Sequence, residues 1–161
     1  MKILVDTNVI IDALTSREPF REDAEQIFMF AANRIEDMYI TASSATDIYY
    51  LVRKYLHSTE QAKSVMSKLY ELFYILDVTS SECKEALLSD MNDYEDAVIS
   101  CCALRNHIDY IVTRNIKDYE RSKVQAILSA EFIKVVSRDK WQYLMWISTN
   151  IIETRGVLGR T

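Results

Sequence analysis

Apolar residues recur along the chain in two patterns, one typical of buried strands and the other typical of amphipathic helices. Short apolar runs, rich in β-branched residues, occur at 3–5, 38–41, 74–78, 110–113 and 124–128. Between them, apolar residues at i, i+3, i+4 and i+7 predict helices at about 8–14, 21–33, 43–57, 58–73 and 80–88, and after 92. Such alternation predicts an α/β fold, a three-layer α/β/α sandwich with a central parallel sheet.

The C-terminal part of the chain continues the helical pattern. Ser129 to Phe132 predicts a short capped helix, and apolar residues from Trp141 to Ile152 predict a final amphipathic helix. We therefore assign residues 1–137 to one domain and residues 138–161 to a C-terminal helical extension of that domain. The apolar stripe of the extension either folds back on the domain or packs on a partner chain.

Composition narrows the class of protein. With 161 residues, 49% of them hydrophobic, the chain can bury a core of its own as a single domain. Two glycines and one proline leave little support for glycine-rich phosphate loops or turn-dense all-β folds. Cys83, Cys101 and Cys102 are odd in number and lack zinc-ligand spacing, which suits a reducing cytosol. Without a signal peptide or a membrane-spanning apolar run, we expect a soluble cytoplasmic protein with no membrane partner.

The charge balance argues against a uniformly basic nucleic-acid binder, because 19 basic and 24 acidic residues give a net charge of −5. A local basic rim around an acidic centre remains compatible with that total. The basic residues near the predicted strand ends that could supply this rim are Arg17, Arg53, Lys54, Arg105, Arg114, Lys117, Arg121 and Lys123.

Acidic and amide side chains stand at the ends of predicted strands or in the first turns of the helices that follow. These residues are Asp6, Asp47, Asp96, Asn115 and Asp118. The loops that leave parallel strands form one crevice, so these side chains could converge there. Each acid alone could instead cap a helix or stabilise the positive end of its dipole.

Converging carboxylates repel one another, and a hard cation such as Mg²⁺ or Mn²⁺ relieves that repulsion. A cation held in this way can activate water and stabilise an in-line phosphoryl displacement. The sequence offers no convincing His, Cys or Ser nucleophile that would favour another chemistry.

Five segments resemble, in order and spacing, the motifs of the PIN domain family: VDTNVIID at 5–12, TDIYY at 46–50, YEDA at 94–97, IVTRN at 111–115 and KDY at 117–119. The resemblance covers about residues 1–135. It implies a PIN-like nuclease domain, with a parallel sheet between helices, that hydrolyses single-stranded RNA as an Mg²⁺- or Mn²⁺-dependent endoribonuclease. It also implies the toxin of a VapC-type toxin–antitoxin pair, with an antitoxin partner and a homodimeric state.

Carried over by position, the resemblance implies that Asp6 and Asp96 bind metal and that Asp47 fills the second acidic position of the metal site. Asn115 stands where many members of the family have an acid, which weakens a second metal site, and Asp118 could compensate. The candidate catalytic set is therefore Asp6, Asp47, Asp96, Asn115 and Asp118. The segment after about residue 137 is longer than the family core requires.

Three other functions share part of this pattern. A phosphatase of the haloacid dehalogenase type needs a second Asp two residues after the first, where this chain has Asn8. A receiver domain could use Asp77 but needs a Lys that residues 113–115 lack. A PIN-fold module that binds RNA or protein without cleaving it stays open, because Asn115 is neutral.

Overall fold

Strands and helices alternate along the chain in the predicted order, and the computed structural model describes residues 1–138. The strands are β1 (Lys2–Val5), β2 (Asp37–Thr41), β3 (Tyr74–Leu76), β4 (Tyr110–Val112) and β5 (Ala126–Ile127). The helices are α1 (Thr7–Leu14), α2 (Arg21–Ala32), α3 (Ala42–Leu56), α4 (Thr59–Leu72), α5 (Ser80–Leu87), α6 (Tyr94–Arg105) and the 3-10 helix η1 (Ile116–Tyr119).

The five strands form one sheet in which every neighbouring pair is parallel, in the order β3-β2-β1-β4-β5. The chain builds outward from β1 to β3 and then crosses back to place β4 on the other side of β1. The carboxyl ends of β1 and β4 are thus the point where the direction of winding reverses, the place where ligands bind in open α/β sheets. Val5 pairs with Val112, so both strands end together there.

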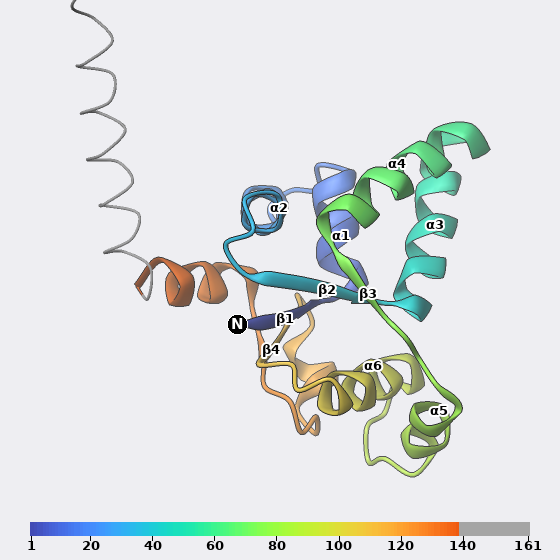
Figure 1. Cartoon of the computed structure of the whole chain (residues 1–161), viewed down its shortest axis with the longest axis vertical. Helices are drawn as coiled ribbons and strands as arrows, with labels where there is room; N and C mark the ends of the chain where they lie inside the picture. Colours follow the sequence, from blue (N-terminus) through green and yellow to red (C-terminus); the bar gives the residue numbers. More distant parts are fainter. Residues whose placement is uncertain (139–161) are drawn as a thin grey trace, which may run out of the picture.

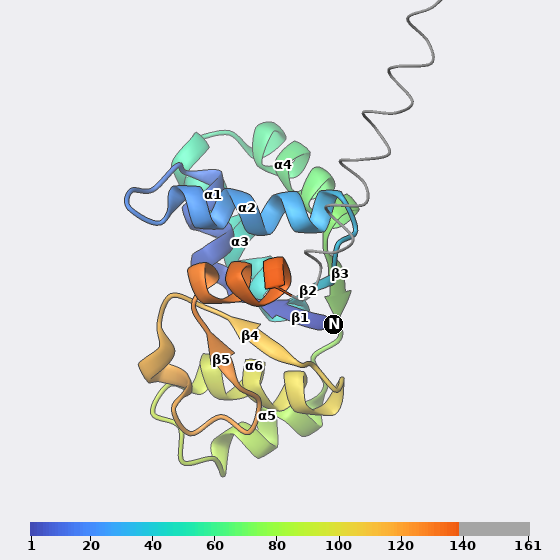
Figure 2. The ribbon, with the colours of Figure 1, turned by 90° about the vertical axis from the view of Figure 1, so that its left-hand side faces the viewer.

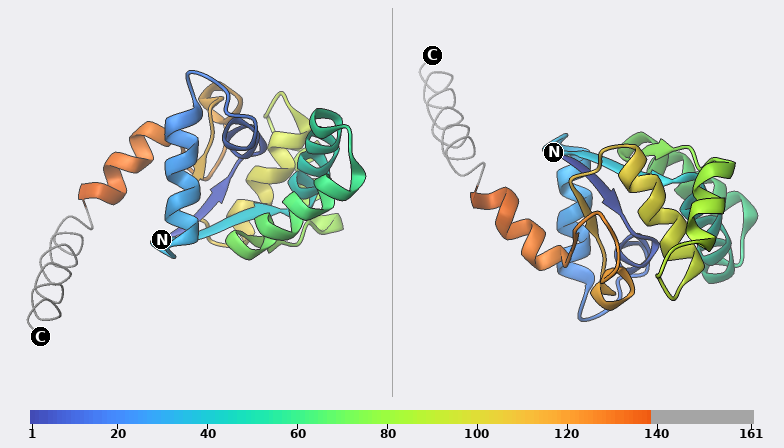
Figure 3. Two further views of the ribbon diagram at one scale, coloured as in Figure 1. Left: turned by 90° about the horizontal axis from the view of Figure 1, so that it is seen from above. Right: turned by 90° about the horizontal axis from the view of Figure 1, so that it is seen from below.

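Helices cover both faces of the sheet: α1 to α4 lie on one side, and α5 and α6 lie on the other (Figure 1). Figure 3 shows the same arrangement from above and below. Successive side chains of β1 point to opposite faces of the sheet. Ile3 and Val5 lie in the core under α1 to α4, whereas Leu4 packs with Ile99 of α6. The predicted three-layer α/β/α sandwich is therefore confirmed.

A helix over residues 129–138 follows β5 and packs beside α2 (Figure 2). Its Phe132 is fully buried, and the centroid of its ring lies 6.4 Å from that of Phe30 and 6.3 Å from that of Tyr110. The predicted final helix, with Trp141 to Ile152, lies outside the described residues. The assignment of residues 138–161 to a helical extension therefore stays a prediction.

Helices α5 and α6 are joined by a buried carboxylate, Glu82. Its Oε2 accepts hydrogen bonds from the backbone N–H and the hydroxyl of Thr79, which caps α5. Its Oε1 accepts from Arg105 of α6, with which it forms an ion pair. Burial alone would raise the pKa of Glu82, but the bonds from Thr79 and Arg105 outweigh it and lower the pKa to about 2. The two helices form one wall of the pocket described below.

The three cysteines, Cys83, Cys101 and Cys102, are free thiols. Burial raises the pKa of the Cys101 and Cys102 thiols, which keeps both protonated and unreactive at neutral pH. Within residues 1–138, no helix combines the length and the apolar character needed to cross a membrane.

Candidate active site

Asp6 is held in place at the junction of β1 and β4. It follows β1 directly and is the N-cap residue of α1, and its Oδ2 accepts hydrogen bonds from Thr113 Oγ1 (2.7 Å) and Asn8 Nδ2 (2.6 Å). Its backbone N–H donates to the carbonyl of Val112 (2.9 Å). Burial raises the pKa of Asp6, and the hydrogen bonds from Thr113, Thr7 and Asn8 offset part of that rise.

Asn8 ties the start of α1 to the loop after β4. Its amide donates to Thr113 Oγ1 (3.1 Å) as well as to Asp6, and its Oδ1 accepts from the backbone N–H of Arg114 (3.1 Å). The Arg114 side chain binds both oxygens of the buried Asp12 (2.7 and 2.8 Å) and lies over the ring of Phe20. Arg114 is therefore engaged inside the domain, and its predicted place in a basic rim is not what the structure shows.

Asp96 enters the site from the first turn of α6. Asp93 caps this helix by accepting hydrogen bonds from the N–H groups of Glu95 and Asp96. The hydroxyl of the buried Tyr119, in η1, donates to Asp96 Oδ1 (3.0 Å). Burial raises the pKa of Asp96 to about 6: the Tyr119 bond lowers it, and the charges of Asp6 and two other acids, Asp93 and Asp118, add to the rise.

One cavity of about 400 Å³ brings Asp6, Asp47 and Asp96 together. They come from three elements, the β1–α1 junction, the first half of α3 and the start of α6. The rest of the lining consists of Thr7, Ser43, Thr46, Leu51, Val78, Cys83, Tyr94, Glu95, Val98 and Ile99. We call this cavity the acid pocket. The structure thus places three residues of the predicted set at one site, while their catalytic roles stay predictions.

Asn115 and Asp118 do not line the acid pocket. Asn115 is exposed, and its backbone N–H donates to Thr113 Oγ1 (3.0 Å). Asp118 is exposed on η1, and its charge contributes to the raised pKa of Asp96. Asp118 therefore acts on the site electrostatically, whereas Asn115 shares only the anchoring hydroxyl of Thr113 with it.

The donors at the acid pocket suit a hard divalent cation. Within residues 1–138, no three acidic, histidine or cysteine side chains lie close enough together to hold one ion as they stand, and Asp47 is exposed on α3. Mg²⁺ in proteins is commonly bound through one or two carboxylates and keeps several waters. Asp6 and Asp96, two carboxylates with raised pKa values at one cavity, meet that requirement.

Sequence reasoning missed the side chains that hold the two acids. Tyr119 and Thr113 lie in the segments KDY and IVTRN, but nothing in the sequence showed that their hydroxyls would reach Asp96 and Asp6. Asn8 could have been noticed as the polar residue two positions after Asp6. Glu95 also lines the acid pocket and was not proposed as a site residue.

The family model of the PIN domain matches residues 2–117. No curated protein matches the chain.

Solved structures of similar shape include chains with low sequence identity. A chain of VapBC2 from Rickettsia felis, bound to a promoter DNA fragment, is 20% identical with a TM-score of 0.58, covering 80% of this chain and 98% of that one. A toxin-antitoxin complex from Klebsiella pneumoniae gives 21% identity and a TM-score of 0.57, with coverages of 79% and 97%. VapC20 from Mycobacterium tuberculosis, described as a sarcin-ricin loop cleaving toxin, is 13% identical with a TM-score of 0.53, covering 68% of this chain and 86% of that one.

Proposed function

The chain belongs to the PIN domain family, and we propose that it is a metal-dependent endoribonuclease that hydrolyses phosphodiester bonds of single-stranded RNA. The observation that carries this proposal is the meeting of Asp6 and Asp96 at the acid pocket, where both carboxyl groups have raised pKa values. Groups with strongly perturbed pKa values at a cavity are candidates for a functional site.

Asp6 and Asp96 would hold Mg²⁺ or Mn²⁺, which supplies an activated water and neutralises charge on the phosphate oxygens. Thr113 and Asn8 fix the orientation of the Asp6 carboxylate, and the Tyr119 hydroxyl fixes that of Asp96. Such supporting bonds orient the metal ligands, and removing one typically costs about 10- to 100-fold in metal affinity or activity.

The other acids of the predicted set have more peripheral parts in this proposal. Asp47, exposed on α3 and lining the acid pocket, would accept a proton or orient a water, in place of the direct metal contact that the family resemblance implies. Asp118 raises the pKa of Asp96 through its charge, and Asn115 is left without a direct part in the reaction. The choice of RNA is supported by the family and by one structural neighbour described as a sarcin-ricin loop cleaving toxin.

The test is cleavage of a labelled single-stranded RNA by the purified protein with Mg²⁺ or Mn²⁺. Asp96→Asn should abolish cleavage and weaken Mn²⁺ binding while the circular dichroism spectrum stays unchanged. Asp37→Asn, the same change on an exposed residue at the opposite end of the sheet, should cleave like the wild type. Full activity of Asp96→Asn would remove the metal-site argument. A wild type that binds Mn²⁺ or RNA but cleaves nothing would favour the non-catalytic interaction module instead.

We further propose that the protein is the toxin of a toxin-antitoxin pair, forms a homodimer and acts in the cytoplasm. The support is the family, the likeness to a chain of a toxin-antitoxin complex, and the free thiols, which suit a reducing compartment. Co-purification with the product of an adjacent small reading frame, and light scattering of the purified protein, test the partner and the dimer. Growth unaffected by expression of the active protein alone would argue against a toxin.

A further inference from the structure

A second, polar cavity of about 380 Å³ lies at the end of α3, where α4 begins. It is lined by Tyr50, Arg53, Lys54, His57 and Thr59. Tyr50 is 60% exposed and Arg53 and Lys54 are exposed, so an aromatic ring and two permanent cations face solvent together. We call Tyr50, Arg53, Lys54 and His57 the α3 track.

The α3 track and the acid pocket lie along the same helix. Residues from the first half of α3, among them Asp47, line the acid pocket, and residues from its second half form the α3 track. Asp47, Tyr50 and Lys54 stand at i, i+3 and i+7, so they share one face. From Asp47 to Lys54 the distance along the helix axis is about 10 Å, at about 1.5 Å per residue. Figure 1 shows α3 running from the sheet edge toward the start of α4.

The cations of the α3 track are uncommitted, unlike several others that the sequence suggested for a basic rim. Arg105 pairs with Glu82, and Arg121 donates to a backbone carbonyl. Within the described part of the chain, Arg53 and Lys54 form no ion pair. Their charges are therefore available to a ligand.

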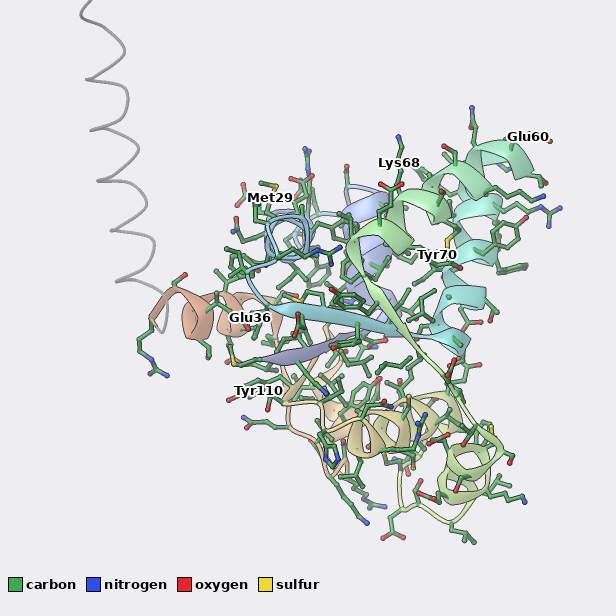
Figure 4. All side chains as sticks on the ribbon, in the orientation of Figure 1. Met29, Glu36, Glu60, Lys68, Tyr70 and Tyr110 are labelled. Atoms are coloured by element: carbon green, nitrogen blue, oxygen red, sulfur yellow. The ribbon has the colours of Figure 1, made fainter. Side chains whose placement is uncertain are left out.

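The N-terminus of α4 lies at the same cavity. Thr59 is the first residue of α4, and the N–H groups of a helix N-terminus favour anions. Glu60, labelled in Figure 4, is the acid of that turn, and it accepts a hydrogen bond from the Ser58 hydroxyl. Basic side chains, an exposed ring and a helix start thus meet in one cavity.

We propose that the α3 track binds single-stranded RNA beside the acid pocket, with Arg53, Lys54 and His57 on backbone phosphates and one base stacked on Tyr50. This inference rests on the proposed nuclease function and identifies where its substrate lies. Basic side chains that follow the backbone, combined with exposed aromatic rings that stack on bases, are the general means of binding single strands.

A second copy of the chain is the other occupant to be weighed. A two-fold dimer through this face would set the patch against itself, bringing Arg53 and Lys54 close to their own copies. Charged residues, lysine in particular, are depleted from the buried centres of protein interfaces. The charge of the α3 track therefore favours a polyanion over a second copy.

The first test measures how salt affects binding of the full-length protein to a fluorescein-labelled 12-nucleotide oligouridylate, with EDTA present to prevent cleavage. The double variant Arg53→Gln/Lys54→Gln should bind more weakly. Its affinity should also depend less on salt: the negative slope of log affinity against log salt should become shallower by about 1.4, since each single-strand phosphate contact contributes about 0.7. Lys63→Gln/Lys68→Gln removes two charges from α4, where Lys68 points away from the sheet (Figure 4), and should leave the slope unchanged.

The second test separates stacking from charge. Tyr50→Ala should weaken oligouridylate binding about tenfold, the effect of losing one stacked base. Tyr55→Ala is the matched control, because Tyr55 is also on α3 and 60% exposed but does not line the cavity. It should bind like the wild type.

The outcomes separate this inference from the proposed function. A wild type that cleaves RNA while both α3-track variants bind it as tightly as their controls would overturn the track and leave the nuclease standing. Weakened binding in these variants, in a protein that cleaves nothing, would support the track and overturn the nuclease. If light scattering showed that the variants lose a dimer while RNA affinity is unchanged, the face would be an interface between copies and the proposal would fall.

Discussion

Replacing Asp96 by Asn should stabilise the metal-free protein at neutral pH while abolishing its activity. The fold holds this carboxyl in a half-buried place near Asp6, where its pKa rises from an ordinary value near 3.8 to about 6. An acid with a raised folded-state pKa binds its proton more tightly when folded, so the folded state loses stability as the pH rises from about 4 to about 6. Above pH 6 the full cost of folding with an ionised Asp96 is present.

The size of that cost follows from the pKa. One pKa unit corresponds to about 1.4 kcal/mol, so a rise from 3.8 to about 6 corresponds to about 3 kcal/mol. Because the side chain is only half-buried, water screens part of this interaction, and we take about 2 kcal/mol. Asn loses the attraction between a carboxylate and the start of α6, about 0.5 kcal/mol. Its amide oxygen can still accept the bond from Tyr119, so the expected gain is about 1–1.5 kcal/mol.

Urea unfolding in EDTA, at pH 7.5 and at pH 4, measures this difference. Asp96→Asn should be more stable than the wild type at pH 7.5, and the difference should vanish or reverse at pH 4. Adding Mg²⁺ at pH 7.5 should stabilise the wild type more than the variant, because only the intact site binds the ion well. If Asp96→Asn were no more stable than the wild type at pH 7.5 without cation, the fold would not destabilise the ionised Asp96 carboxylate, and the reasoning would be refuted.

Three further predictions concern the framework of the site. Because the fold lowers the pKa of Glu82 to about 2, the wild type should lose stability as the pH falls from about 4.5 to about 2. In urea titrations over this pH range, Glu82→Gln should lack this loss. Identical profiles for the two proteins would contradict the role of the buried carboxylate. Arg114→Met should cost about 2–3 kcal/mol of unfolding free energy by leaving the buried Asp12 with only the more distant Arg17, and a loss below 1 kcal/mol would count against it. Phe132→Ala should lower the free energy of unfolding by about 3–5 kcal/mol, because it opens a cavity between α2 and β4. Thermal and urea unfolding measure this loss. An unchanged midpoint would show that the helix over residues 129–138 is not part of the cooperative core.

Much of the fold could be predicted because the relevant pattern is local. The apolar run Ile3-Leu4-Val5 and the helical spacing of residues such as Ile48 and Val52 show strand or helix within a few positions, whatever the rest of the chain does. The choice of Asp6 and Asp96 also came from local position, since Asp6 follows β1 and Asp96 lies in the first turn of α6. Asp47 was expected in the first turn of its helix, but α3 begins at Ala42, so Asp47 lies in the second turn. The parallel arrangement followed from the alternation of the two element types.

The partners of the two acids were decided only by the tertiary structure. Thr113 reaches Asp6 across 107 residues of sequence, and Tyr119 reaches Asp96 because η1 turns the chain back toward α6. The same hydrophobic pattern would serve several orders of strands, and only the observed order puts the end of β4 beside the end of β1. Hydrophobic periodicity shows which face of an element is buried, but not which other element covers it. The sequence could therefore not show that Arg114 pairs with Asp12 and does not belong to a basic rim.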